Sequence, residues 1–186
     1  MNVVVFFTDQ QRWDTTGVHG NPCMLTPNFD KMAMEGTHVY EAFTPQPVCC
    51  PARGVLQTGK YATTVGTYRN ARVLGRAHKT MADYFNAAGY DTGYIGKWHL
   101  GSGRGAVPEE ERGGYQYWLG ANSLEHTSTA YHTVVYDNEN QEVTLPGYRV
   151  DALTDAAIRY IDAHKEHPFF LFISYLEPHF QNSNDS

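Results

Sequence analysis

The sequence predicts an α/β fold, a mostly parallel sheet sandwiched by helices, in one domain that spans residues 1–186. Three short apolar runs, at residues 3–7, 91–95 and 169–173, are typical of strands in the core of a parallel sheet. Segments with apolar residues at helical spacing separate these runs, and strands that alternate with helices favour this architecture. No internal repeat or linker divides the chain, so we expect a single domain.

Two strands and two helices are predicted in the first sixty residues. Val3–Phe7 is a continuous apolar, β-branched run, the pattern of a strand buried on both faces. Residues 26–36 favour a short amphipathic helix, because an N-cap threonine precedes a proline and a glycine ends the pattern. We expect a further strand at residues 38–43 and a helix at residues 51–57.

The second half of the chain predicts two helices, two strands and one irregular segment. Residues 80–88 have helical spacing and end at a glycine, and residues 91–95 favour a core strand. Glycines interrupt residues 101–147, so we interpret this segment as a loop-rich insertion. Residues 150–161 predict a helix of about four turns, and residues 169–173 predict a third buried strand.

Composition and charge exclude several classes of protein. The chain carries 14 Lys+Arg against 20 Asp+Glu, a formal net charge of −6, which disfavours nucleic acid or an anionic membrane surface as partner. No apolar run approaches the ~20 residues that a membrane-spanning helix needs. We find no secretory signal in this chain, and exported and cytoplasmic locations both stay open. Three cysteines, two of them adjacent, predict no disulfide framework.

Polar side chains follow each of the three apolar runs. Asp9 and Gln10 come after the first run, Lys97 and His99 after the second, and His179 after the third. In open α/β sheets, ligands bind beyond the carboxyl ends of the strands. We therefore expect these five side chains to converge on one site.

Two motifs carry a resemblance to a known family. The stretch Cys49-Cys-Pro-Ala-Arg-Gly-Val-Leu-Gln-Thr-Gly59 resembles the signature of the type I sulfatases, Cys-x-Pro-x-Arg followed by Leu-x-Thr-Gly. Gly89-Tyr-Asp-Thr-Gly-Tyr-Ile-Gly-Lys-Trp-His-Leu-Gly101 resembles their second signature. The resemblance runs over essentially the whole chain and implies an alkaline-phosphatase-like sulfatase fold that is incomplete at its C-terminus.

The resemblance implies a covalent nucleophile derived from Cys49. A maturation enzyme oxidises this cysteine to formylglycine, an aldehyde that hydrates to a geminal diol. One hydroxyl attacks the sulfur of a sulfate ester, and deprotonation of the other expels sulfate and restores the aldehyde. Arg53, one helical turn further on, is expected to hold the diol. Cys50 fills the variable position of the motif and is given no role.

The resemblance also implies a divalent cation and further catalytic residues. Asp9, Gln10 and the matured Cys49 are the expected ligands of one Ca²⁺ ion, with Mg²⁺ or Mn²⁺ as alternatives. Many relatives have aspartates at the positions of both Asp9 and Gln10. Gln10 therefore removes one negative charge from the metal site and leaves the metal preference open. Lys97 is expected to neutralise sulfate oxygens. His99 is expected to position the diol or accept its proton, and His179 is a candidate general acid.

We therefore predict the hydrolysis of a sulfate ester, either of a sulfated carbohydrate or of an aryl sulfate. One alternative is a formylglycine-dependent phosphonate monoester or phosphodiester hydrolase, a class in which an Asp-Gln metal pair is common. The other is an inactive, truncated remnant with an unmodified thiol pair. The family has further metal ligands and a second lysine downstream of the position of His179, so we expect this chain alone to be inactive.

Overall fold

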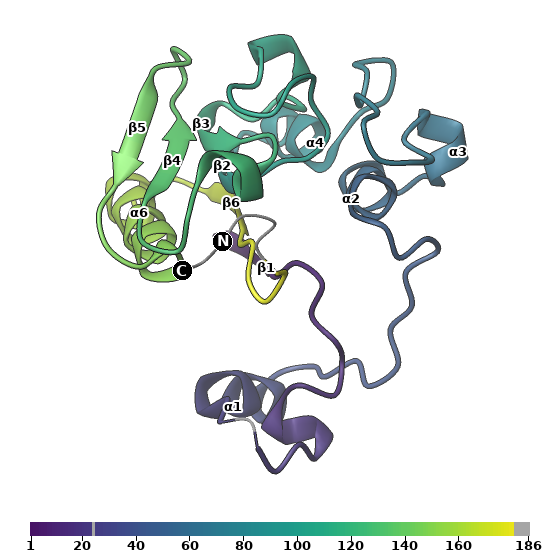
Figure 1. Ribbon diagram of the computed structural model, residues 1–186, viewed down its shortest axis with the longest axis vertical. Helices are drawn as coiled ribbons and strands as arrows, with labels where there is room; N and C mark the ends of the chain where they lie inside the picture. Colours follow the sequence, from purple (N-terminus) through teal and green to yellow (C-terminus); the bar gives the residue numbers. More distant parts are fainter. Residues whose placement is uncertain (24, 181–186) are drawn as a thin grey trace.

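The computed structural model describes residues 1–23 and 25–180, which form a mixed sheet flanked by helices (Figure 1). The strands are β1 (Val3–Phe7), β2 (Asp91–Lys97), β3 (Tyr117–Ala121), β4 (Thr133–Tyr136), β5 (Glu142–Leu145) and β6 (Phe169–Ser174). Their order is β1-β6-β2-β3-β4-β5. The first four strands in this order pair in parallel, and β4 and β5 add antiparallel pairs. The predicted α/β class with a mostly parallel sheet is confirmed.

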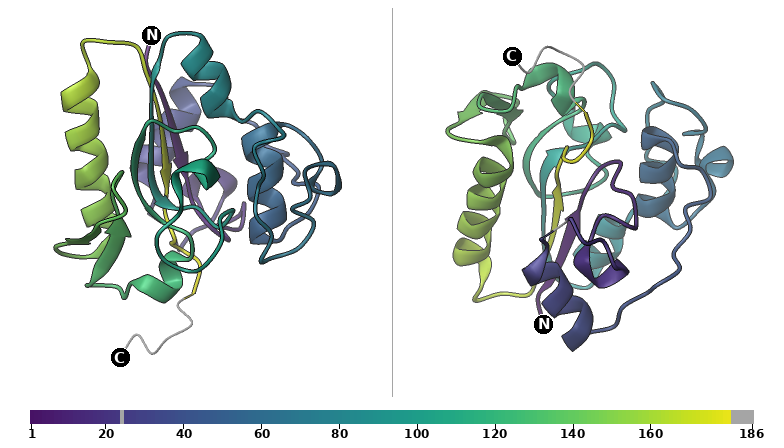
Figure 2. Two further views of the ribbon diagram at one scale, coloured as in Figure 1. Left: turned by 90° about the horizontal axis from the view of Figure 1, so that it is seen from above. Right: turned by 60° about the horizontal axis from the view of Figure 1, so that its bottom comes forward.

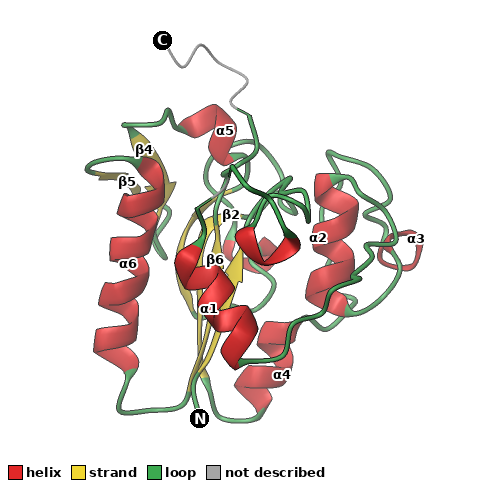
Figure 3. Cartoon of the chain, turned by 90° about the horizontal axis from the view of Figure 1, so that it is seen from below, coloured by secondary structure: helices red, strands yellow, loops and turns green. Residues whose placement is uncertain are grey.

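Helices cover both faces of the parallel strands. α6 (Arg149–His164) packs on one face, and α2 (Cys49–Thr58) and α4 (Met81–Ala87) lie on the other (Figure 2, Figure 3). The smaller elements are α1 (Pro27–Glu35), α3 (Ala62–Val65), α5 (Leu124–Thr127), and the 3-10 turns η1 (Gly17–His19) and η2 (Glu109–Glu111). α1 packs against η1, apart from the sheet (Figure 1). Within the described residues, the length and polarity of the helices rule out a transmembrane helix.

The four predicted helices are present as α1, α2, α4 and α6. α4 begins with a capping box, in which Thr80 and Asp83 satisfy each other's backbone N–H groups. α2 begins at Cys49 rather than at Pro51. This earlier start puts Cys49 in the first turn of the helix, next to the ends of the strands.

β6 shows why a continuous apolar run predicts burial on two faces. Side chains alternate between the faces of a sheet. Phe169, Leu171 and Ile173 pack in the cluster beneath α6, whereas Phe170 and Phe172 pack in the cluster beneath α2 and α4. All five side chains are at most 3% exposed.

β1 differs from its prediction because it is the edge strand of the described sheet. Val3, Val5 and Phe7 pack toward α2 and α4. Val4 and Phe6, on the other face, are 44% and 62% exposed. α6 lies over β6 and β2 and does not extend over the outer strand. The prediction that β1 is buried on both faces is therefore wrong for the described chain.

Two further predictions are corrected. Residues 38–43 form no strand, because no strand of the described sheet pairs with them. The predicted loop-rich insertion at residues 101–147 contributes β3, β4, β5 and α5. Each of these strands has only four or five residues, too few to give a long apolar run. Their presence makes the sheet mixed.

Gly96 allows the central strands to approach closely at their carboxyl ends. Its φ is +103°, and a Cβ atom there would lie 2.0 Å from the carbonyl oxygen of Ser174 on β6. A Cβ atom on Gly120 of β3 would lie 2.6 Å from the carbonyl oxygen of Gly96. Only glycine fits both the left-handed backbone and the contact.

We expect Gly96→Ala to lower the free energy of unfolding by at least about 3 kcal/mol, because the added methyl group pushes β2 away from β6. Gly75→Ala is the matched control, since a Cβ atom at that position meets nothing within 4 Å. Urea unfolding followed by circular dichroism measures both variants. Equal stability of the two variants would contradict this account of the strand ends.

Candidate active site

The predicted polar residues meet at the carboxyl edge of the parallel strands. Asp9 follows β1, Lys97 ends β2, His179 follows β6, and Cys49 begins α2. The potential ligand atoms of Asp9, Cys49 and His179 all lie within 4.8 Å of one another. Nζ of Lys97 is 2.8 Å from Oδ2 of Asp9. The structure therefore brings together side chains from three strand ends and one helix start.

Arg53 joins the three strand ends. Its Nη1 donates to the carbonyl oxygen of Lys97 at 2.7 Å and to Oγ of Ser174 at 2.9 Å. Its Nη2 donates to Oδ2 of Asp9 at 3.1 Å, and the side chain is 4% exposed. These hydrogen bonds go to protein groups, so a contact between Arg53 and a hydrated Cys49 side chain stays a prediction.

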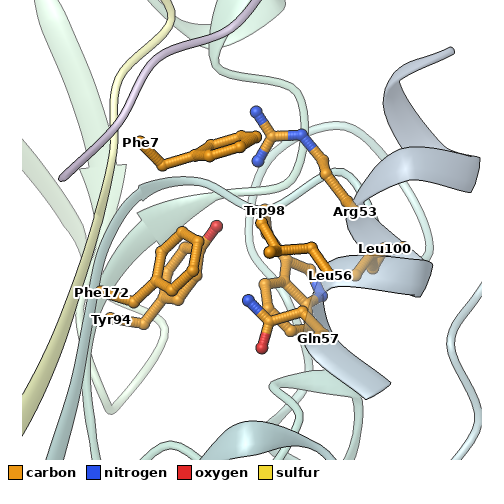
Figure 4. Close-up of a pocket in the computed structure, with 8 residues that line it drawn as sticks. All are labelled: Phe7, Arg53, Leu56, Gln57, Tyr94, Trp98, Leu100 and Phe172. Atoms are coloured by element: carbon orange, nitrogen blue, oxygen red, sulfur yellow. The ribbon is translucent and has the colours of Figure 1, made fainter. Parts of the chain in front are cut away.

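Apolar side chains enclose the Arg53 guanidinium (Figure 4). Its Cζ lies 5.2 Å from the centre of the Phe7 ring. Tyr94, Trp98 and Phe172 line the space beneath it. That space has no room for a water molecule, so it is a packing gap and not a ligand site. Trp98 belongs to the core.

Asp9 uses one carboxylate oxygen for two cations. Oδ2 accepts from Arg53 and pairs with Lys97, whereas Oδ1 faces Sγ of Cys49 at 4.0 Å. Burial alone would raise the pKa of Asp9, but Arg53 and Lys97 together outweigh burial and the pKa is lowered. The carboxylate is therefore ionised, with one oxygen turned toward Cys49.

Glu125 is a site residue that was not predicted from the sequence. It lies in α5, is 5% exposed, and places Oε2 at 3.2 Å from Nζ of Lys97. Lys97 therefore forms ion pairs with two buried carboxylates, those of Asp9 and Glu125. The polar residues that follow β3 could have pointed to Glu125, as polar residues after the other strands did. They were not considered because residues 117–121 were not predicted to form a strand.

The environment of Cys49 keeps its thiol protonated. Burial raises the pKa of this thiol and Asp9 adds to the effect, against opposing contributions from Lys97 and Arg53. A thiol with a raised pKa is a poor nucleophile at neutral pH, because the thiolate is the reactive form. At neutral pH the unmodified Cys49 therefore carries the thiol and not the reactive thiolate.

The neighbouring Cys50 is a core residue. Its side chain is fully buried, and its Sγ donates to the carbonyl oxygen of Arg72 at 3.3 Å. Its backbone N–H donates to Oδ1 of Asn70 at 3.1 Å. These contacts turn Cys50 away from the strand ends, in agreement with the absence of a predicted role.

His99 lies just outside β2 with a left-handed backbone, φ +60°. Strand alternation therefore does not set the direction of its side chain relative to Lys97. Burial and the charge of Lys97 lower the pKa of His99 to about 4, although Glu125 opposes them. Its buried Nδ1 has no hydrogen-bond partner among the described residues. The ring is neutral at pH 7 and can accept a proton.

His179 and Gln10 are the two remaining residues of the predicted site. Nδ1 of His179 donates to the carbonyl oxygen of Phe180 at 2.6 Å. Gln10 is exposed and has φ +56°. It adjoins Asp9 in the chain, and its role as a metal ligand stays a prediction.

Comparison with known proteins places this geometry in a family. The sulfatase family model matches residues 1–186. An ulvan-active sulfatase from Formosa agariphila is 37% identical over 188 residues, which cover 98% of this chain and 36% of that protein. The chain therefore spans little more than a third of this curated relative.

Solved structures share the fold. A putative sulfatase yidJ from Bacteroides fragilis has a TM-score of 0.85 at 27% identity, over 96% of this chain and 44% of that one. BT4656, solved with its substrate D-glucosamine-2-N,6-O-disulfate, has a TM-score of 0.84 at 26% identity, over 96% and 34%. A phosphonate monoester hydrolase of Agrobacterium radiobacter reaches only 0.69 at 21% identity, over 96% and 41%. This last likeness concerns the fold alone.

We expect the stability of the protein to fall as the pH decreases from about 6.5 to about 4, with His99 as one cause. Its pKa is lowered from 6.5 to about 4 on folding, so between these values the unfolded state binds more protons and is favoured. His99→Gln should flatten the dependence of the unfolding free energy on pH over this window. Denaturant unfolding at several pH values measures the slope.

His167→Gln is the control for this experiment, because His167 is exposed and its ring meets water in both states. It should keep the wild-type slope. A His99→Gln variant with the wild-type slope would show that His99 titrates alike in the folded and unfolded chains.

Proposed function

The chain belongs to the sulfatase family, and on that premise we propose that it carries the nucleophile of a sulfuric ester hydrolase. The observation that supports this most directly is the meeting of Cys49, Asp9, Lys97 and His179 at one sheet edge, within a family match that spans the chain. We propose a sulfated carbohydrate as substrate. The support is BT4656, a structural neighbour whose substrate is a sulfated glucosamine.

Cys49 is proposed to act after a maturation enzyme has oxidised it to formylglycine. One hydroxyl of the hydrated aldehyde attacks the sulfur, and the alcohol leaves with a proton from His179. His99 then accepts the proton of the second hydroxyl as sulfate departs and the aldehyde re-forms. The neutral state of His99 at pH 7 supports this role. The raised pKa of the unmodified Cys49 thiol argues against the thiolate as nucleophile.

Lys97 is proposed to bind the sulfate oxygens. Its Nζ is fully buried and forms ion pairs with Asp9 and Glu125. An ammonium group has three N–H donors, so the two carboxylates leave one donor for an entering anion. A buried charge that is fixed before the substrate arrives stabilises the transition state without reorganisation. Arg53 is proposed to act on the sulfate at longer range through its charge, because its hydrogen bonds go to the strand ends.

Asp9 and Cys49 fit a divalent cation, since their potential ligand atoms lie within 4.8 Å of each other. His179 lies within the same distance, but we assign it proton transfer, because one imidazole nitrogen cannot bind a metal and donate a proton at the same time. With a cysteine sulfur, this donor set suits zinc. With the oxygens of a matured Cys49 and an amide oxygen from Gln10, it would suit Ca²⁺, Mg²⁺ or Mn²⁺. When bound, the cation supplies positive charge that polarises the sulfate and favours an ionised diol oxygen.

We propose the hydrolase activity for a protein of the full length of these relatives. The resemblance implies further ligands and a second lysine downstream of the position of His179, and this chain spans 36% of the ulvan-active sulfatase. We propose that residues 1–186 alone have negligible hydrolase activity and weak calcium affinity, because Asp9 and Gln10 supply too few of the ~6 to 8 oxygens that calcium usually takes. The experiments below use the full-length protein.

A phosphonate monoester or phosphodiester hydrolase is the second candidate, and Gln10 is the residue that favours it. Gln10 in place of an aspartate leaves the metal end of the site less neutralised, which favours a more anionic ligand. The solved phosphonate monoester hydrolase is a more distant neighbour, with a TM-score of 0.69 against 0.85 for the sulfatase. Lys97-Trp-His99 keeps the sulfatase signature, and we give this motif more weight.

The first prediction for this function concerns maturation. Expressed with a formylglycine-generating enzyme, the protein should carry an aldehyde at Cys49 and a free thiol at Cys50, because Cys50 is packed in the core. Mass spectrometry of peptides that cover residues 46–60 measures both positions. Two free thiols under these conditions would remove the covalent mechanism.

The second prediction concerns substrate class. For the matured protein, kcat/KM for an aryl sulfate should exceed kcat/KM for the matching phosphodiester and phosphonate monoester by at least ~10-fold, or ~1.4 kcal/mol. Lys97→Ala should reduce sulfate turnover by about 10²- to 10³-fold, as loss of a preorganised charge does. Lys165→Ala removes the same charge from an exposed position after α6 and should leave turnover unchanged. A preference for the phosphonate would make the second candidate correct.

A further inference from the structure

A pocket of about 530 Å³ opens beside His99. Residues 70–73 form one wall and residues 101–104 form another, and Asn122, Ser123 and His126 complete the lining. His99 belongs both to this lining and to the charged group at the strand ends, since the charges of Lys97 and Glu125 act on it. The pocket therefore adjoins the site where the sulfate ester is proposed to react.

The pocket carries two arginines in a chain of negative net charge. Arg72 and Arg104 line it together with the imidazoles of His99 and His126, and no aspartate or glutamate is among its lining residues. The whole chain has a formal net charge of −6, so this local excess of positive charge runs against the composition. A concave surface that carries one sign of charge concentrates ligands of the opposite sign.

The two arginines keep donors available. The Arg72 guanidinium lies over the Tyr68 ring, with Cζ 4.7 Å from the ring centre, and it donates to the Tyr68 hydroxyl. Its Nε is buried and has no hydrogen-bond partner among the described residues. Arg104 is exposed, and neither arginine forms a salt bridge within the described chain. Guanidinium groups with free donors match carboxylates and sulfates in a bidentate manner.

The walls of the pocket are held in place without a ligand. The Asn122 side chain accepts from the N–H of Gly101 and donates to the carbonyl oxygens of Gly101 and Gly103. The carbonyl oxygen of Arg104 accepts from the N–H of Ser123 at 2.7 Å. A pocket that is already ordered loses less entropy when a ligand binds.

We propose that this pocket binds a second anionic group of the substrate, so that the protein selects glycans that carry a carboxylate or a further sulfate next to the sulfate ester that is cleaved. This rests on the proposed function, because the pocket adjoins the reacting group only through His99. Arg72 and Arg104 are the specificity-determining residues. A glycan with a single sulfate has no second anionic group to accept hydrogen bonds from these two arginines.

The test compares three substrates of the matured, full-length protein: a monosulfated neutral sugar, the same sugar with a second sulfate, and a monosulfated disaccharide that contains a uronate. We expect kcat/KM to be higher for the two dianionic substrates. The double variant Arg72→Gln with Arg104→Gln should reduce the ratio of dianionic to monoanionic kcat/KM by about 10-fold, mainly through KM. Comparison of the two dianionic substrates identifies which anion the pocket prefers.

Arg159→Gln is the matched control, since it removes one positive charge from the exposed side of α6; the ratio should not change. An equal loss on all three substrates, or an unchanged ratio in the double variant, would overturn the inference. Calorimetry of disulfated sugar binding to the unmatured protein tests the pocket without hydrolysis, so it distinguishes a failure of this inference from a failure of the proposed function. If wild type and double variant bind it equally, the pocket is not the subsite, whether or not the matured protein hydrolyses any sulfate.

Discussion

The site depends on the hydrogen bonds of the buried Arg53 guanidinium. It bonds to the backbone at the end of β2, to the Ser174 hydroxyl at the end of β6, and to Asp9 after β1. Burying a guanidinium costs several kcal/mol unless its charge and donors are matched. Here they are matched by all three strand ends. Because Arg53 and Cys49 share one helix, these bonds also fix Cys49, the proposed nucleophile, relative to the sheet.

A balance of buried charge follows from this arrangement. Arg53 and Lys97 face Asp9 and Glu125, so two cations meet two carboxylates and the formal sum is zero. An entering sulfate monoester adds one negative charge. A cation beside the free oxygen of Asp9 would offset that charge, which is a physical reason for a metal at this position. The same burial keeps His99 neutral, because Lys97 and desolvation both disfavour its charged form.

Two residues with a strained backbone line the pocket proposed for the second anionic group of the substrate, and one of them, His99, also adjoins the site of the sulfate ester. His99 and Ala71 both have a positive φ, near +60°, and both line the basic pocket. Non-glycine residues adopt this conformation at a cost and keep it where the surroundings enforce it. His99 lies in the loop between β2 and η2, and Ala71 lies in the loop between α3 and α4. Loops attached to the sheet therefore position the groups that would contact the proposed glycan.

The sequence by itself determined the central strands, the four main helices, and the meeting of Asp9, Lys97 and His179, and the family resemblance added Cys49. Burial on two faces leaves a continuous apolar run, and parallel strands bring their carboxyl ends to one edge. Only the tertiary structure decided that Val4 and Phe6 are exposed, that residues 101–147 contain strands, and that Glu125 reaches Lys97. Short strands and edge positions have little local pattern. Partners such as Glu125, and shifts such as the lowered pKa of His99, depend on residues brought close only by folding.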